Sequence, residues 1–71
     1  MKKFVVTIPN EINNQYFEEF LQCKLNMEFY SAGIVSIVYV SKFKPKNFKQ
    51  EILKNFGLCT CQNIYCERKE V

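Results

Sequence analysis

Two prolines and two glycines are the only strong breakers of regular structure in this chain, and their positions constrain its fold more than any other feature. Pro9, Gly33, Pro45 and Gly57, together with Asn26, divide the 71 residues into six short segments. No repeat, linker or low-complexity stretch interrupts the series. We therefore expect one domain over residues 1–71.

Four of the segments are typical of β-strands. Residues 2–8 alternate, with Phe4, Val6 and Ile8 on one face. Residues 27–32 and 34–43 are rich in β-branched and aromatic side chains, and the tight join at Gly33 predicts a hairpin. Residues 58–69 predict either one edge strand or a small hairpin that turns at residues 62–63.

The other two segments have helical periodicity. Residues 11–25 place Phe17, Leu21 and their neighbours in one apolar stripe, with Asn10 as the candidate N-cap and Asn26 as the stop. Residues 46–56 repeat the pattern, and Gly57 follows where a left-handed residue commonly ends a helix.

The order β-α-β-β-α-β predicts an α+β fold of the ferredoxin-like kind. Each helix has an apolar stripe to bury, so both helices should cover one face of a four-stranded antiparallel sheet. Right-handed crossovers then place the first and third strands in the centre. An α+β sheet with another strand order is the alternative. Phe20, Leu21, Ile52 and Phe56 should be buried against the strand residues Phe4, Val6 or Ile8.

The absence of histidine excludes the commonest general base and every histidine-containing catalytic or metal site. Neither a dinucleotide-binding glycine fingerprint nor a P-loop occurs. We therefore expect a non-catalytic protein without a cofactor.

The four cysteines are interpreted as small packing residues. Cys59, Cys61 and Cys66, with Cys23 as a remote fourth ligand, leave a small thiolate–metal protein as one alternative. The C-x-C spacing chelates a single ion less well than C-x₂₋₄-C does, and so no metal is expected.

A basic region around the second predicted helix suggests nucleic-acid binding as another alternative function. Its lysines interleave with Phe43 and Phe48, a pattern that suits phosphate contacts with base stacking. Single-stranded nucleic acid is the partner that this region would bind. The lysines are Lys42, Lys44, Lys46, Lys49 and Lys54.

The main functional hypothesis is a protein interface on the sheet face that the helices leave open. Tyr30, Val35, Ile37 and Tyr39 are its candidate residues, on one face of the hairpin. We expect a small binding module that occupies a surface of a larger protein or ribonucleoprotein complex, with a homodimer also possible. A stand-alone chain of this size suits a phage or mobile-element accessory protein, for example an anti-CRISPR inhibitor of a defence nuclease. The apolar stretches are too short for a signal peptide or a membrane span, which predicts a cytoplasmic protein and no membrane partner.

Overall fold

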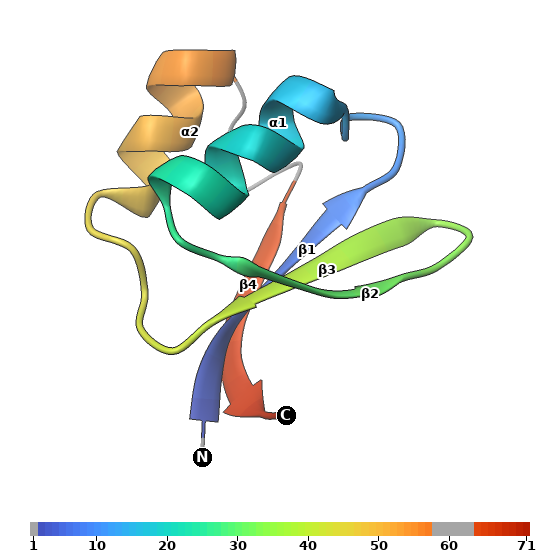
Figure 1. Ribbon diagram of the computed structural model, residues 1–71, viewed down its shortest axis with the longest axis vertical. Coiled ribbons are helices and arrows are strands. Elements are labelled where there is room, and N and C mark those ends of the chain that lie inside the picture. The colour runs from blue at the N-terminus through green and yellow to red at the C-terminus, as the bar shows by residue number, and fades with distance from the viewer. Residues whose placement is uncertain (1, 58–63) are drawn as a thin grey trace.

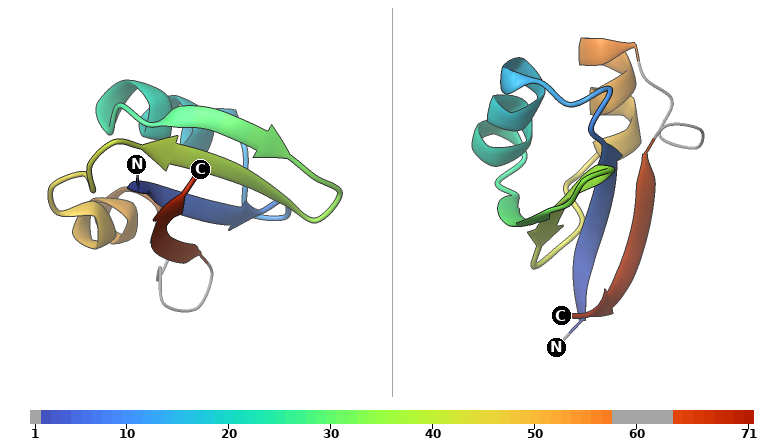
Figure 2. Two further views of the ribbon diagram at one scale, coloured as in Figure 1. Left: turned by 90° about the horizontal axis from the view of Figure 1, so that it is seen from below. Right: turned by 90° about the vertical axis from the view of Figure 1, so that its right-hand side faces the viewer.

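The computed structural model describes residues 2–57 and 64–71 and shows a small α+β fold. Both helices lie side by side on one face of a four-stranded antiparallel sheet (Figures 1 and 2). The elements in chain order are β1 (Lys2–Pro9), α1 (Gln15–Glu19), the π-helical turn η1 (Phe20–Lys24), β2 (Glu28–Ala32), β3 (Ser36–Ser41), α2 (Phe48–Phe56) and β4 (Tyr65–Glu70).

The strand order is β2-β3-β1-β4, so the first and third strands are central, as expected from the sequence. β1 pairs antiparallel with both β3 and β4, and Val6 lies opposite Tyr39 on one side and Cys66 on the other. β2 pairs with β3 and forms one edge of the sheet. The turn predicted at residues 62–63 lies outside the described residues.

The first helix begins later than the sequence predicted. Residues 10–12 form turns, in which the Ile12 amide donates to the Pro9 carbonyl. Asn14 is the N-cap, and its side-chain oxygen accepts a hydrogen bond of 2.9 Å from the Phe17 amide. The prediction of Asn10 as the N-cap is therefore wrong, and the Asn10 side chain instead donates to carbonyls of the loop between β2 and β3.

This helix ends in a widened turn before the strand β2. The Leu25 amide donates to the Phe20 carbonyl across five residues, and the Met27 amide donates to the Leu21 carbonyl. Asn26 adopts a left-handed conformation with φ of 54°, which confirms it as the stop. The second helix likewise ends at Gly57 with φ of 68°, as its sequence predicted.

The core lies between the helices and one face of the sheet. Phe4, Val6 and Ile8 are buried there, in agreement with the sequence prediction. Of the four predicted helix residues, Leu21 and Ile52 are fully buried, whereas Phe20 and Phe56 are partly buried and pack against the core. The other buried members of this cluster are Phe17, Met27, Tyr39, Phe48 and Ile64.

Among the described residues, Tyr39 is the one core residue with a hydroxyl, and that group is poorly satisfied. Its side chain is fully buried, and the hydroxyl has no hydrogen-bond partner of normal geometry within the described residues. Burial, together with the nearby Glu18 carboxylate, raises the pKa of Tyr39 to about 12. The folded state therefore keeps the Tyr39 proton at pH values where an unfolded chain loses it.

We expect Tyr39→Phe to leave the protein about as stable at neutral pH, since the buried hydroxyl makes no hydrogen bond of normal geometry within the described residues. Between about pH 10 and pH 12 only the unfolded state releases the proton, so the wild type loses stability as pH rises, by about 2 kcal/mol near pH 11.5. The Phe variant should lack this loss. Urea unfolding of both proteins at about pH 8 and about pH 11.5 measures the difference. Equal losses in the two proteins would contradict the burial of this hydroxyl.

Candidate protein-binding surface

The loop between β2 and β3, residues 33–35, carries Ile34, the most exposed large apolar side chain among the described residues, next to the exposed Val35. We call these three residues the hairpin tip. Ile34 is 99% exposed and Val35 is 77% exposed. The hairpin projects beyond the helices (Figures 1 and 2). Both side chains are therefore largely in solvent. Burial in the core therefore does not explain why these positions are apolar.

Asn10 holds the backbone of the hairpin tip in place. The Asn10 amide donates to the Val35 carbonyl at 2.9 Å. Its side-chain nitrogen donates to the Ile34 carbonyl at 2.8 Å and to the Gly33 carbonyl at 3.2 Å. Within the loop, the Gly33 amide donates to the Ser36 carbonyl at 2.8 Å. The polar backbone of the tip is thus tied to the end of β1, while the apolar side chains face solvent.

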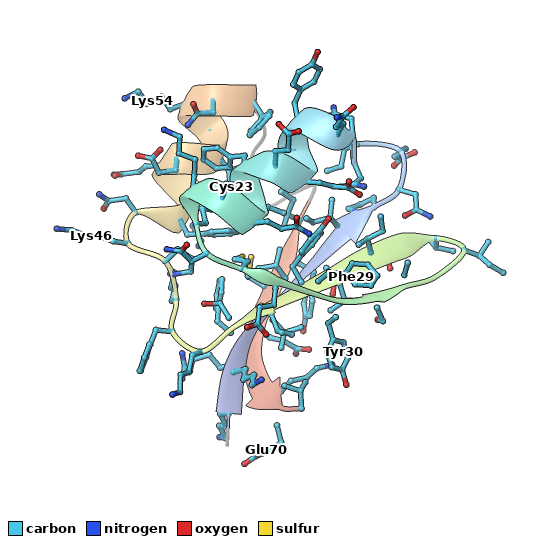
Figure 3. The ribbon with its side chains drawn as sticks, viewed as in Figure 1. Cys23, Phe29, Tyr30, Lys46, Lys54 and Glu70 are labelled. Atoms are coloured by element: carbon cyan, nitrogen blue, oxygen red, sulfur yellow. The ribbon has the colours of Figure 1, made fainter. Side chains whose placement is uncertain are left out.

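The strand β2 extends this apolar surface. Phe29 and Tyr30 are each 55% exposed, and they lie on opposite sides of the strand (Figure 3). All five residues of β2 are exposed, because the strand is an edge and the helices do not cover it. Four of the nine large apolar side chains that are exposed among residues 2–57 and 64–71 therefore belong to this one hairpin.

Of the four residues predicted to form an interface, two are exposed, one is partly buried and one is fully buried. Tyr30 and Val35 are exposed, whereas Tyr39 is fully buried on the helix side of the sheet, opposite Val6. Ile37 is partly buried against the core and lies opposite Ile8. The four residues therefore do not form one exposed patch.

Ile37 and Tyr39 are buried because they lie opposite the core residues Ile8 and Val6, on the face of β3 that the helices cover. A β-bulge explains why Tyr30 does not share this face. Phe29 lies opposite Tyr39 and Ser31 lies opposite Val38, so Tyr30 is the extra residue in β2. The bulge places Phe29, rather than Tyr30, on the face of Tyr39, and the two rings meet edge to face with centroids 6.1 Å apart. Strict alternation along the sequence could not anticipate this change.

The sheet face opposite the helices is not an open apolar platform. Val5 and Val40 lie opposite each other there and are only 1% and 3% exposed. Glu28 and Glu67 flank this pair in the register of the sheet. The centre of this face is therefore not exposed apolar surface.

The predicted basic residues are separated by the fold into two groups. Lys42, Lys44 and Lys46 lie on the segment from the end of β3 to α2, and Lys49 and Lys54 lie on α2. All five are exposed. Lys42 and Lys44 line a pocket together with Lys3 of β1, which the sequence reasoning did not include. Only the pairing of β1 with β3 brings Lys3 to this place.

Two of the four cysteines of the metal alternative lie among the described residues. Cys59 and Cys61 lie outside the described residues, Cys23 is exposed on η1, and Cys66 is half-buried on β4. Among residues 2–57 and 64–71 there is no cluster of three or more cysteine or acidic side chains that could hold a metal ion. The cysteine hypothesis therefore stays a prediction.

Comparison with protein-family models, with curated proteins and with solved structures found no match to this chain. In the part of the chain that the structure describes, neither helix has the length and apolar character needed to cross a bilayer.

The hydrogen bonds from Asn10 to the hairpin tip give a direct prediction. In Asn10→Asp the carboxylate cannot donate, so the Gly33 and Ile34 carbonyls lose a partner and face a negative charge. Backbone amide order parameters at residues 33–35 should then fall from about 0.85 toward 0.6 in ¹⁵N relaxation measurements. Asn55→Asp on α2 is the matched control and should leave the tip unchanged. A tip that stays rigid in Asn10→Asp would show that these hydrogen bonds do not hold it.

Proposed function

We propose that this chain is a non-catalytic protein-binding module and that the hairpin tip is its anchor. The observation that carries the proposal is the pair Ile34 and Val35, held out in solvent on a loop whose carbonyls are bound by Asn10. A loop that is already held by hydrogen bonds loses little conformational freedom when it binds. More of the contact energy is therefore retained as affinity. Ile34 would enter an apolar pocket of the partner, in the way that central anchors act at protein interfaces.

The edge strand β2 gives the partner a second point of contact. Its outer side has no neighbouring strand within the described residues, and Phe29 and Tyr30 offer aromatic surface on either side of it. Aromatic side chains are enriched at interfaces because they add large contact area at low entropic cost. The bulge at Tyr30 twists the edge, which disfavours simple edge-to-edge pairing of identical chains. A different protein is therefore the favoured partner over a second copy.

The proposal includes a mode of action and a fold family. A small module without catalysis acts by occupying a surface of a larger protein or ribonucleoprotein, as a phage or mobile-element inhibitor of a defence nuclease would. The order β-α-β-β-α-β with β1 and β3 in the centre supports a ferredoxin-like arrangement. This arrangement places the end of the β2–β3 hairpin at one side of the molecule, away from the helices (Figure 1).

Photo-cross-linking in the natural host tests this proposal. A photoreactive residue is introduced at position 34 and, as the matched control, at Leu53, which is 58% exposed on α2. We expect a discrete protein adduct from position 34 and none from position 53. Adducts that form equally at both positions, or only at position 53, would refute the hairpin tip as the anchor.

A further inference from the structure

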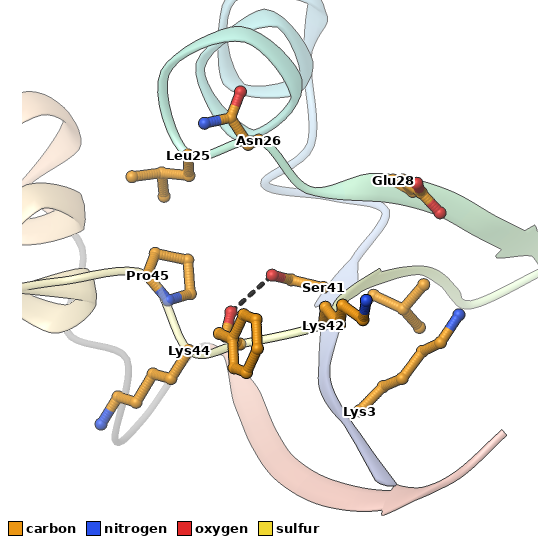
Figure 4. Close-up of a pocket in the computed structure, with 10 residues that line it drawn as sticks. Lys3, Leu25, Asn26, Glu28, Ser41, Lys42, Lys44 and Pro45 are labelled. Carbon is orange, nitrogen blue, oxygen red and sulfur yellow. Dashed lines mark hydrogen bonds between the residues drawn. The ribbon is translucent and has the colours of Figure 1, made fainter. Parts of the chain in front are cut away.

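A pocket of about 540 Å³ opens at the end of the β2–β3 hairpin that lies away from the tip (Figure 4). The end of η1, the start of β2, the end of β3 and the segment leading to α2 surround it. This volume is within the range of small-molecule sites. The residues that line it include Lys3, Glu28, Lys42, Phe43 and Lys44.

Three lysines border this pocket against a single acidic residue, Glu28. The side chains of Lys3 and Lys42 extend in the same direction, and Lys44 extends the other way (Figure 4). No ion pair within the described ranges 2–57 and 64–71 involves any of the three lysines. Their charges are therefore available to an anion.

The register of the sheet concentrates positive charge at this place. Lys3 lies opposite Lys69 on β4, and because Phe4 lies opposite Ser41, Lys3 also lies beside Lys42. Lys69 is paired with Glu67 at 3.3 Å, which leaves Lys3 and Lys42 as adjacent like charges. Like charges directly across a sheet are destabilising, so this arrangement does not serve the fold. A bound anion would relieve it.

An exposed aromatic residue is the chain neighbour of two of these lysines. Phe43 is 72% exposed, between Lys42 and Lys44 in the chain. The Ser41 hydroxyl donates a hydrogen bond to the Phe43 carbonyl, which fixes the backbone of this turn. An exposed aromatic ring with flanking lysines matches the two parts of a nucleotide, because the ring stacks on a base and the lysines bind phosphate.

We propose that this pocket binds a nucleotide unit, with its phosphate at Lys3 and Lys42 and its base on Phe43. The site is separate from the hairpin tip, since the two lie at opposite ends of β2 and β3. It does not depend on the proposed protein interface. The nucleotide comes either from a single strand or from free nucleotides, and the two sources share this chemistry.

Fluorescence anisotropy with a labelled single-stranded DNA of about ten nucleotides tests the proposal, because a groove of this kind covers about 4–16 nucleotides. Two phosphate contacts give a salt exponent of about −1.4, so raising salt from about 0.05 M to about 0.2 M should weaken binding roughly sevenfold. Competition by unlabelled AMP and ADP distinguishes the sources. Weak competition indicates a strand, and competition at equal affinity indicates a free nucleotide.

Variants locate the site. Lys3→Gln and Lys42→Gln should each reduce the salt exponent by about 0.7, and Phe43→Leu should lower affinity about tenfold through lost stacking. Lys54→Gln on α2 is the control, because Lys54 is equally exposed but does not line the pocket. The proposal is overturned if neither the strand nor the mononucleotides bind at about 0.05 M salt, a concentration at which phosphate contacts are strong. An equal effect of Lys54→Gln and Lys42→Gln would also overturn it, since it would indicate diffuse charge attraction.

Discussion

Ile34→Asp should lower the affinity for the cross-linked partner at least a hundredfold while leaving the free protein folded. The Ile34 side chain is 99% exposed, so its replacement removes no internal contact, and stability should change by less than about 0.5 kcal/mol. In the complex the same side chain would be an apolar anchor, and a carboxylate in its place would be desolvated without a partner. The effect on binding is therefore large and the effect on folding is small.

A graded series at this position separates anchoring from general disturbance. Ile34→Val should weaken binding several-fold, because it removes about one buried methylene worth roughly 0.8 kcal/mol. Ile34→Ala should weaken it more, and Ile34→Asp most. Leu53→Asp is the matched control, an exposed apolar residue on α2 changed to the same charge. Isothermal titration calorimetry with the purified partner gives the affinities. If Leu53→Asp is as damaging as Ile34→Asp, the hairpin tip has no special role.

Phe17→Ala should destabilise the domain by about 3–5 kcal/mol, the usual cost of removing a large buried side chain. Phe17 is 1% exposed and packs against Phe56 with ring centroids 4.7 Å apart, so it joins the two helices. A domain of this size has a total stability of only about 4–10 kcal/mol, so the variant should be largely unfolded or close to it.

Phe43→Ala is the control for this substitution. It makes the same chemical change at a side chain that is 72% exposed, and it should alter stability by less than about 0.5 kcal/mol. Urea unfolding followed by circular dichroism measures both variants. If Phe17→Ala lowers stability by less than about 1 kcal/mol, α1 does not pack against α2 and the sheet as described.

The second helix was well predicted because its signals are local. Phe48 and Ile52 repeat at helical spacing, and Gly57 ends the helix in the left-handed conformation that the sequence indicated. The alternation of Phe4, Val6 and Ile8 likewise gave the buried face of β1. Each of these patterns is formed by residues close together in the chain. The sequence alone is therefore sufficient to predict this helix and this face of β1.

The first helix and the candidate surface depend on contacts between distant residues. Asn10 and Asn14 are both good N-cap candidates, and Asn10 is excluded only because its side chain bonds carbonyls 23 and 24 residues away. The bulge at Tyr30 reverses which side chains of β2 share a face with Tyr39. Lys3 joins Lys42 only through the register of β1 and β3. These features follow from tertiary pairing, which no single segment specifies.

The footprint of the partner on this chain tests the central claim most directly. A ¹⁵N-labelled sample of the 8.5 kDa chain is titrated with the unlabelled partner, and the amide signals are followed residue by residue. We predict that the signals of the hairpin tip and of β2 shift or broaden first and most, while those of α2 stay in place. Changes confined to α2, or to the lysine pocket at the other end of the hairpin, would contradict the hairpin tip as the protein-binding anchor.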